Sequence, residues 1–328
     1  MKFFPYHPCS GIIPFHLHEA KLTLAVAFEE NYMKLVSRRI LLTGLLLSMA
    51  LAALPTRLQA APKSPKRSIK KISGDLYRFQ NNFHFSVFFV TADGIVVADP
   101  INKGAASWLK GELKKRFNKP VKYLIYSHDH QDHISGGEVF ADTATVIAHK
   151  NAKADIVGEK RPTATPDITF SDKMTLSLGG KQIELTYVGK SHSDNMVVMR
   201  FPAERTLYAC DFVAVKSVGF KKLSDAYLPE WIDAIKVVEG LDFDTLATCH
   251  GKMGKMSDVK DQRGFYEDLY GAVLKAAQAG KSLEEMKASI KLEKYKSWGR
   301  YKNYLPLNVE GVYNQLKLHR RPTRHRRR

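Results

Sequence analysis

Short apolar stretches separated by turn residues mark the chain between residues 75 and 126. The stretches 75–80 and 84–91 predict two strands, and the second is almost wholly apolar, as in a strand buried on both faces. Asp93-Gly94 predicts a turn. Two further strands are expected at 95–99 and 121–126, and apolar positions at helical spacing predict a helix between them at 103–117.

A second series of the same kind occupies residues 145–249. A helix is expected at 229–241, and strands are expected at 145–148, 173–178, 181–188, 196–201, 206–210 and 245–249. Gly179-Gly180 lies between two of these strands and is typical of a hairpin turn. Two half-length series of strands and helices predict two sheets facing each other with helices outside, an αββα sandwich of the α/β class.

The remainder of the chain is predicted to be helical. Ser282 and Glu285 have the spacing of a capping box, and the last helix is expected at 308–318. This part offers no candidate ligand residues, and we expect it to form a C-terminal helical extension over 255–318.

The N-terminal region resembles an export signal. Arg38-Arg39 precedes an apolar run that ends near Leu54, and small residues follow up to Ala60-Ala61. This order predicts a signal peptide over 33–61, cleaved near Ala60-Ala61, and a periplasmic or secreted protein without a stable membrane span. The arginine pair suits the twin-arginine route and equally an ordinary basic signal.

Residues 1–32 fit poorly in front of such a signal. We expect translation to begin at Met33 and 1–32 to be a mis-assigned extension; the alternative is an unusually long charged region.

The net charge of +18 is concentrated at the chain ends. Without residues 1–61 and the last twelve residues, 38 basic and 30 acidic residues leave +8. A body of this charge is not a dedicated nucleic-acid binder. We expect the tail 319–328 to be a solvated, disordered charge run.

The strongest chemical signal is the heptad Ser127-His128-Asp129-His130-Gln131-Asp132-His133, directly after a predicted strand. His192, Asp211 and His250 also follow predicted strands, where functional loops of sandwich folds gather. Imidazole and carboxylate ligands without thiolate suit zinc, and also iron or manganese.

Together, His-x-His-x-Asp-His, a later His, an Asp after a strand and a final His-Gly resemble the metallo-β-lactamase superfamily, over about residues 74–251. The resemblance implies a domain over 73–254, preceded by a basic linker at 62–72. It implies one Zn²⁺ on His128, His130 and His192, and a second on Asp132, His133 and His250, with Asp211 bridging. Asp99 would support the metal loop, and catalytic Asp132 would also orient a hydroxide that attacks a small-molecule substrate.

The implied activity is hydrolysis of an ester, lactone or amide. Asp at position 211 resembles the glyoxalase II and lactonase branches more than the true zinc β-lactamases, although a β-lactamase remains an alternative. Two more hypotheses stay open: a sulfur dioxygenase-like oxidoreductase with a single iron, and a metal-binding module without turnover. The sequence does not indicate the oligomeric state.

Two cysteines and several polar residues lie near these positions. Strand alternation predicts that Cys210 and Cys249 point away from the ligands as buried packing residues; a disulfide between them is the alternative in an exported protein. Candidate substrate contacts are His84, Asn195 and Lys216. Three aromatic residues, whose helical spacing is more typical of core, are Trp298, Tyr301 and Tyr304.

Overall fold

The computed structural model describes Met33, Val36 and residues 64–318. Contacts divide the chain into two units at Lys63/Ser64, and every element below belongs to the unit that begins at Ser64. The expected extension 1–32, nearly all of the expected signal 33–61 and the tail 319–328 lie outside the described residues. Among the described residues, no helix has both the length and the apolar character of a membrane span.

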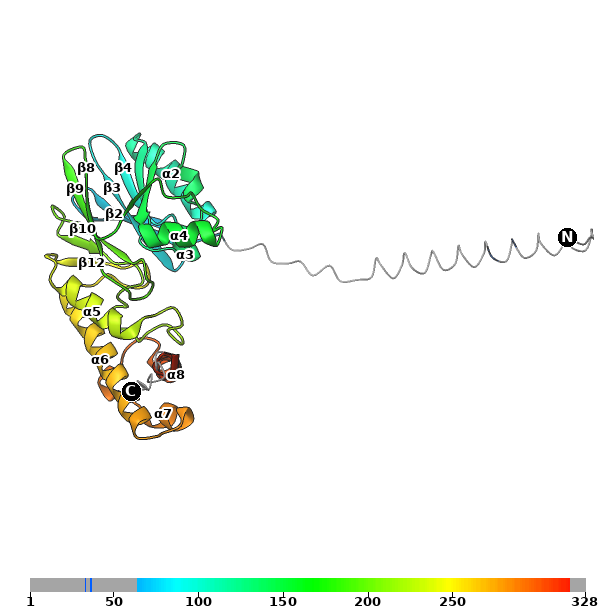
Figure 1. Cartoon of the computed structure of the whole chain (residues 1–328). Helices are drawn as coiled ribbons and strands as arrows, with labels where there is room; N and C mark the ends of the chain where they lie inside the picture. Colours follow the sequence, from blue (N-terminus) through cyan, green and yellow to red (C-terminus); the bar gives the residue numbers. More distant parts are fainter. Residues whose placement is uncertain (1–32, 34–35, 37–63, 319–328) are drawn as a thin grey trace, which may run out of the picture. The chain divides into compact units, whose positions relative to one another are not determined.

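The first sheet has seven strands that lie side by side in chain order. The first four pair antiparallel and the last four pair parallel. Their bounds are β1 Arg67–Ser73, β2 Leu76–Asn81, β3 His84–Val90, β4 Ile95–Ala98, β5 Val121–Ile125, β6 Thr145–His149 and β7 Ile168–Phe170. Figure 1 labels β2, β3 and β4 of this sheet.

The second sheet has five strands in the order β12-β11-β10-β9-β8. The predicted hairpin is confirmed, with Gly179 and Gly180 at φ values of 53° and 75° between β8 and β9. Strands β11 and β12 pair parallel, so their carboxyl ends meet at one edge. The bounds are β8 Lys173–Leu178, β9 Lys181–Tyr187, β10 Val197–Phe201, β11 Thr206–Tyr208 and β12 Thr245–Ala247.

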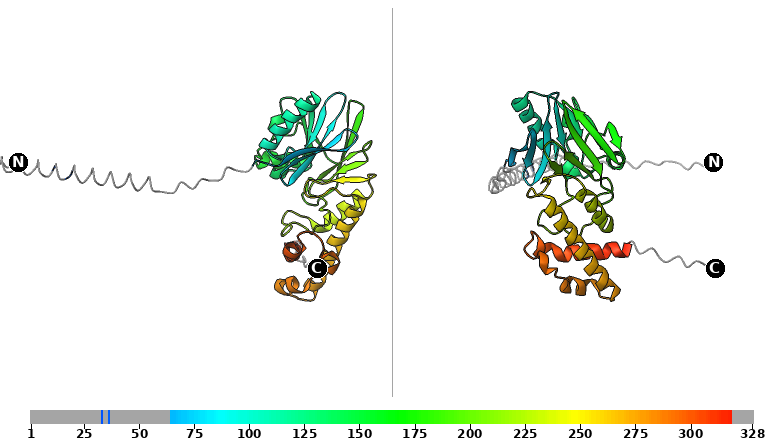
Figure 2. Two further views of the ribbon diagram at one scale, coloured as in Figure 1. Left: turned by 180° about the vertical axis from the view of Figure 1, so that it is seen from behind. Right: turned by 90° about the vertical axis from the view of Figure 1, so that its left-hand side faces the viewer.

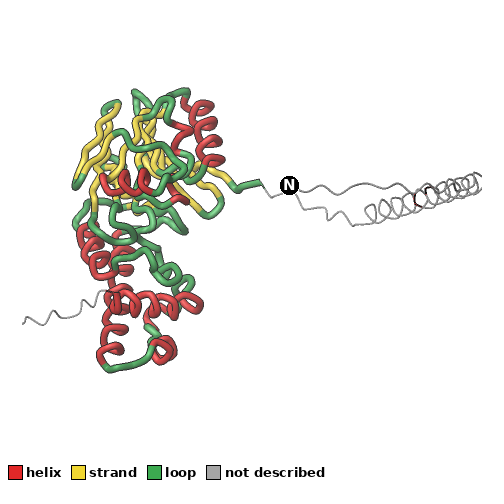
Figure 3. The backbone as a smooth tube through the Cα atoms, turned by 45° about the vertical axis from the view of Figure 1, so that its right-hand side comes forward, coloured by secondary structure: helices red, strands yellow, loops and turns green. Residues whose placement is uncertain are grey.

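Three apolar cores arrange these elements in layers. One core lies between the sheets and includes Phe89, Ile125 and Met199. A second packs the outer face of the first sheet against α2 (Lys103–Phe117) and α4 (Lys150–Gly158). The third packs the outer face of the second sheet against helices, which Figures 2 and 3 show outside the strands. The predicted αββα sandwich is therefore confirmed.

The helices on the second sheet continue into the C-terminal extension. Their bounds are α5 Leu228–Glu239, α6 Met256–Gln278, α7 Leu283–Ser289 and α8 Tyr301–Leu318, with a single 3₁₀ turn at Glu293–Tyr295. The predicted capping box is confirmed, because Ser282 Oγ accepts from the Glu285 N–H and Glu285 Oε2 accepts from the Ser282 N–H. Helix α8 begins seven residues earlier than expected, because Pro306 is accommodated near its start instead of preceding it.

The prediction of a basic linker over 62–72 is wrong from Arg67 onward, where the chain forms the edge strand β1. The register of its pairing with β2 shifts between Lys71 and Ser73. Ile69 packs on the outer core and Ile72 on the core between the sheets, the opposite faces that alternation gives to residues three apart in a strand. Two apolar positions among lysines are too few to display a period of two in the sequence. Lysines on an exposed edge also disfavour pairing with other chains.

Helix α8 holds the loop that follows β11. Asn308 Nδ2 donates to Gly219 O and Lys221 O at 2.9 and 2.7 Å, and Gln315 Nε2 donates to Leu223 O at 3.0 Å. At Gly311 the helix backbone lies so close to the Lys222 backbone that a Cβ atom would overlap the Lys222 carbonyl. A residue without a side chain is therefore required at position 311.

We predict that Gly311→Ala destabilises the protein by about 1–3 kcal/mol, because helix and loop must separate to admit the methyl group. The matched control is Gly271→Ala in α6, where nothing lies within 4 Å of the added Cβ. That change should be neutral or stabilise by up to about 1 kcal/mol, since alanine favours helices. Thermal or urea unfolding measures both variants, and equal stabilities would contradict the close contact.

Candidate metal centre

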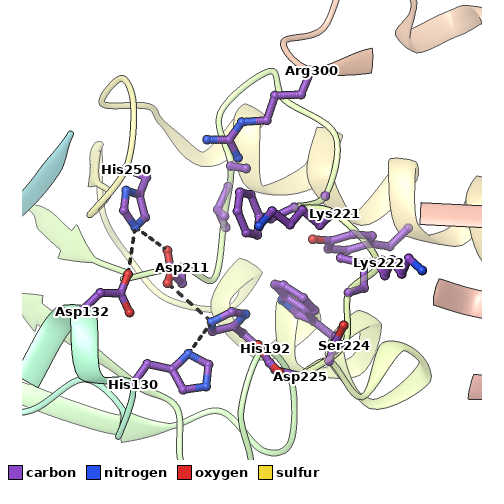
Figure 4. Close-up of a pocket in the computed structure, with 18 of the residues that line it drawn as sticks. His130, Asp132, His192, Asp211, Lys221, Lys222, Ser224, Asp225, His250 and Arg300 are labelled. Atoms are coloured by element: carbon purple, nitrogen blue, oxygen red, sulfur yellow. Dashed lines mark hydrogen bonds and ion pairs between the residues drawn. The ribbon is translucent and has the colours of Figure 1, made fainter. Parts of the chain in front are cut away.

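The candidate ligands gather where strands of both sheets end. The loop after β5 carries His128 to His133 and includes the short helix α3 (Gln131–Ile134). Asp211 and His250 follow the parallel pair β11 and β12, and His192 lies between β9 and β10. A bridge between His84 and His250 joins the two sheets at this edge. Seven side chains from distant parts of the sequence therefore share one site. Figure 4 labels those that face the cavity, His130, Asp132, His192, Asp211 and His250.

The first ligand group consists of His128, His130, His192 and Asp211, whose ligand atoms all lie within 4.8 Å of one another. His192 Nε2 lies 3.0 Å from His130 Nδ1 and 3.4 Å from Asp211 Oδ2. His128 Nε2 lies 3.9 Å from the same Asp211 oxygen.

The second ligand group consists of Asp132, His133, Asp211 and His250, again within 4.8 Å. His133 Nε2 lies 3.0 Å from Asp211 Oδ2 and 3.3 Å from Asp132 Oδ2. His250 Nε2 lies 3.4 Å from Asp211 Oδ1. Asp211 thus belongs to both groups, the position that the sequence resemblance gives it.

One buried nitrogen in particular indicates that the groups fit divalent cations. His128 Nε2 is buried and has no hydrogen-bond partner among the described residues, and the buried His133 Nε2 has only the two carboxylates beside it. An unpaired buried polar atom costs about 1–3 kcal/mol, so native structures rarely leave one without a purpose. The donors of these two groups are imidazoles and carboxylates, the set that zinc, iron and manganese accept. A third group, His133, Cys210, Asp211 and Cys249, adds two thiols within the same distance limit, and thiols favour zinc.

The protonation states of most imidazoles also suit metal binding. Burial lowers the pKa values of His128, His130 and His250 from their ordinary value, leaving these rings neutral near pH 7. Burial opposes ionisation of Asp132, but hydrogen bonds from His133 and His84 hold its pKa below the usual range. Burial likewise opposes the charge of Asp211, and His133 with His192 nevertheless keeps its pKa well below normal.

His133 is the exception in the metal-free site. Burial disfavours its protonation, but the charges of Cys210 and Asp211 raise the pKa of His133 well above the ordinary value. A ligating imidazole must be neutral, so a cation would take the place of the proton that His133 shares with the carboxylates.

Asp99 supports the loop from the end of β4. It is fully buried, accepts the Ser127 N–H and the Tyr208 hydroxyl at 2.8 Å each, and so ties the start of the His loop to β11. Ser127 Oγ lies 3.0 Å from His128 Nδ1 and orients that ring. The hydrogen bonds agree with the supporting position expected for Asp99.

Asn195 supports the same loop instead of lining the cavity, which corrects the expectation of a substrate contact. It is 1% exposed, accepts the Asp129 N–H at 3.0 Å and donates to Asp129 Oδ1 at 3.0 Å. Arg161 forms an ion pair with Asp129 at 2.7 Å. Asp129, between two ligand histidines, is thus a structural anchor that sequence reasoning did not single out.

Both cysteines lie against the ligands, contrary to the alternation argument, although both are buried as expected. Cys210 Sγ lies 3.2 Å from His133 Nδ1, and Cys249 Sγ donates to Asp211 Oδ1 at 3.1 Å and accepts the Asp211 N–H at 2.9 Å. The two thiols are free. Alternation fails because β11 ends at Tyr208 and Asp211 has a left-handed φ of 47°.

The ligands open into a cavity of about 650 Å³. His84 lines it, and His84 Nε2 lies 3.2 Å from Asp132 Oδ2, so this candidate is at the site. Lys216 is not: it pairs with Asp261 and lies over Trp298 at 5.6 Å. The three candidate aromatic residues do not line the cavity; they are Trp298, Tyr301 and Tyr304. They pack at the border of the third apolar core, as their helical spacing in the sequence predicted.

Several cavity residues were missed in the sequence. Trp231 comes from α5, with its ring centre 5.8 Å from that of His192. Lys221 and Phe220 lie in the loop after β11, and Arg300 precedes α8. No motif marks them, because their place depends on how the extension packs.

Comparison with known proteins supports the fold. The family described as the metallo-beta-lactamase superfamily matches residues 85–250. The chain is 25% identical over 191 residues to the 2,4-dinitroanisole O-demethylase subunit alpha of Nocardioides sp. (strain JS1661), covering 57% of this chain and 58% of that protein. It is 26% identical over 190 residues to the metallo-beta-lactamase type 2 of Elizabethkingia meningoseptica, covering 54% of this chain and 75% of that one.

Solved structures share the fold. A metallo-beta-lactamase from Pontibacter korlensis superposes with a TM-score of 0.56 and 23% identity, covering 62% of this chain and 99% of that one. The DIM-1 metallo-beta-lactamase superposes with a TM-score of 0.55 and 18% identity, covering 62% of this chain and 98% of that one.

We predict that Cys249→Val lowers zinc affinity about 10- to 100-fold, because Asp211 loses both contacts with the sulfur. Cys249→Ser preserves a donor and an acceptor and should stay near wild type. Competition with a chromophoric chelator measures both variants. A valine variant that binds zinc as tightly as wild type would mean that the thiol only fills space.

Proposed function

The chain belongs to the metallo-β-lactamase superfamily, and from that premise we propose that it is a dinuclear zinc hydrolase that cleaves an ester, lactone or amide bond in a small molecule. The observation that carries the proposal is that Asp211 belongs to both imidazole–carboxylate ligand groups, members of which line one cavity. The signal-like segment 33–61 supports action in the periplasm.

When bound, two divalent cations supply a water whose pKa is lowered toward about 7 and an electrophile for the substrate oxygen. His128, His130 and His192 would hold one cation; Asp132, His133 and His250 would hold the other, with Asp211 shared. The cysteine and Asp99 contacts fix these side chains before any ligand arrives, so little reorganisation opposes binding.

Asp132 is the best placed group to orient an attacking water and accept its proton. Its side chain is 55% exposed and lines the cavity, while Asp211 is only 17% exposed. The lowered pKa keeps the Asp132 carboxylate ionised at neutral pH, and His84 holds one of its oxygens. Apolar side chains along the cavity, including Phe83 and Trp231, would exclude bulk water from the substrate.

A β-lactamase is the second candidate, because several relatives at 26–28% identity are named metallo-beta-lactamase type 2. The bridging carboxylate of Asp211 weighs against a dedicated β-lactamase. One relative is named as a subunit of 2,4-dinitroanisole O-demethylase, so bonds other than esters, lactones and amides also need to be tested.

The proposal is tested with a hydrolysis panel on the zinc-loaded full chain: aryl esters, lactones, amides, β-lactams and phosphodiesters. Lactone, ester or amide turnover that a chelator abolishes supports the proposal. Turnover confined to β-lactams would favour the second candidate. An iron-loaded chain that consumes oxygen, without hydrolysis by the zinc form, would overturn both.

For the substrate that the panel identifies, we predict that Asp132→Asn lowers kcat about 10²- to 10⁴-fold, because the amide cannot accept a proton. The fold should persist, since the side chain is half exposed. The matched control is Asp142→Asn, an exposed carboxylate paired with Lys110 and absent from the cavity. Full activity in Asp132→Asn would remove this residue from the mechanism.

A further inference from the structure

The cavity wall on the side of the C-terminal extension is basic. Lys221 and Lys222 come from the loop after β11, and Arg300 comes from the turn before α8. The ligand side of the cavity carries the carboxylates of Asp132 and Asp211. Figure 4 shows Arg300 directed from the extension toward the cavity, near Lys221. The cavity is therefore polarised, with its positive side chains away from the candidate ligands.

Two of the three cations are not neutralised. Lys222 Nζ pairs with Glu310 at 2.6 Å. Within residues 64–318, no ion pair with a carboxylate involves Lys221 or Arg300, whereas the nearby Lys216 pairs with Asp261. A cavity that retains two unpaired cations has a positive potential that attracts an anion.

An aromatic platform holds both cations in place. The Arg300 guanidinium lies 5.4 Å from the ring centre of Phe220 and 5.8 Å from that of Tyr304. Lys221 Nζ lies 5.0 Å from the Phe220 ring centre. Aromatic rings beside a guanidinium do not occupy its edge N–H groups, and these form paired hydrogen bonds to an oxyanion.

The rest of the cavity is suited to an apolar body. Leu223, Trp231 and Tyr266 also line it. Asp225 lines it as well and lies on the side of His192 in Figure 4, where its carboxylate would repel an anion. In the metal-free cavity, a molecule with one anionic end would therefore be attracted to the basic wall and repelled from the ligand side.

We propose that Arg300, assisted by Lys221, is an anion subsite that selects substrates with a carboxylate or sulfonate on an apolar body. The scissile bond would then lie at the opposite end, beside Asp132. The inference rests on the proposed function only in treating the cavity as the substrate site. Arg300 lies outside the matched region 85–250, so the C-terminal extension would supply specificity that the shared fold lacks.

A binding measurement tests the subsite without turnover. The probe is 4-methylbenzenesulfonate, with neutral 4-methylbenzenesulfonamide as its partner, titrated calorimetrically into the metal-free full chain. We expect Arg300→Gln to weaken sulfonate binding about 10-fold or more and to leave sulfonamide binding unchanged. Arg300→Lys should recover part of the affinity, and added salt should weaken sulfonate binding to wild type.

The matched control is Lys302→Gln, which removes one charge from the start of α8 at an exposed position outside the cavity. Sulfonate affinity equal to wild type in Arg300→Gln, an equal loss in Lys302→Gln, or no preference of wild type for sulfonate over sulfonamide would overturn the proposal. The titration requires no catalysis. Its result therefore tests the anion subsite even if the chain proves inactive as a hydrolase.

If the zinc form hydrolyses aryl esters, kinetics give a second test. For the 4-nitrophenyl ester of 4-carboxybenzoate, Arg300→Gln should raise KM about 10- to 100-fold with kcat nearly unchanged. For the neutral 4-carbamoylbenzoate ester, neither constant should change. An equal loss on both esters would mean that Arg300 supports the fold of the cavity and not recognition of charge.

Discussion

The contacts of Asp211 organise the whole candidate centre. One carboxylate oxygen lies 3.0, 3.4 and 3.9 Å from Nε2 of His133, His192 and His128, and the other lies 3.4 Å from that of His250. Gathering so many polar groups in a buried place is unfavourable unless charge compensates the lost hydration. Two cations between the groups would supply that compensation and would give the unpaired nitrogen of His128 a partner.

The fold explains how Asp211 reaches this position. Parallel pairing of β11 and β12 puts Asp211 and Cys249 at neighbouring strand ends, where the thiol fixes both the N–H and a carboxylate oxygen of Asp211. Asp99 ties β11 to the start of the His loop through Tyr208 and Ser127. The centre is thus supported by the sandwich itself, and the chemistry proposed for it follows from side chains held by two sheets.

The C-terminal extension has a different role. Helix α8 holds the loop after β11 through Asn308, Gln315 and the close approach at Gly311. The cavity wall that results carries Lys221 and Arg300 opposite the ligands. The candidate metal centre belongs to the sandwich, and the basic cavity wall depends on the extension. The sandwich would therefore determine reactivity, and the extension would determine which substrates bind.

The sequence was most informative where local patterns determine structure. Period-two strands, the helix at 103–117 and the Ser282 cap follow from neighbours in the chain, and the His cluster after β5 identifies itself by composition. Lys216 and Asn195 were misplaced because their direction depends on packing: Lys216 turns to Asp261, and Asn195 turns inward to Asp129. Arg300 could not be predicted as a cavity residue, because it is far along the chain from any candidate ligand. It reaches the cavity only through the packing of α8.

The central claim, that Asp211 is shared by two metal ions, is tested most directly by metal stoichiometry. Mass spectrometry of zinc per chain, after reconstitution and removal of loose metal, should give two ions for the wild type and at most one for Asp211→Asn. One ion or none in the wild type, or two in both proteins, would contradict a dinuclear centre built around this carboxylate.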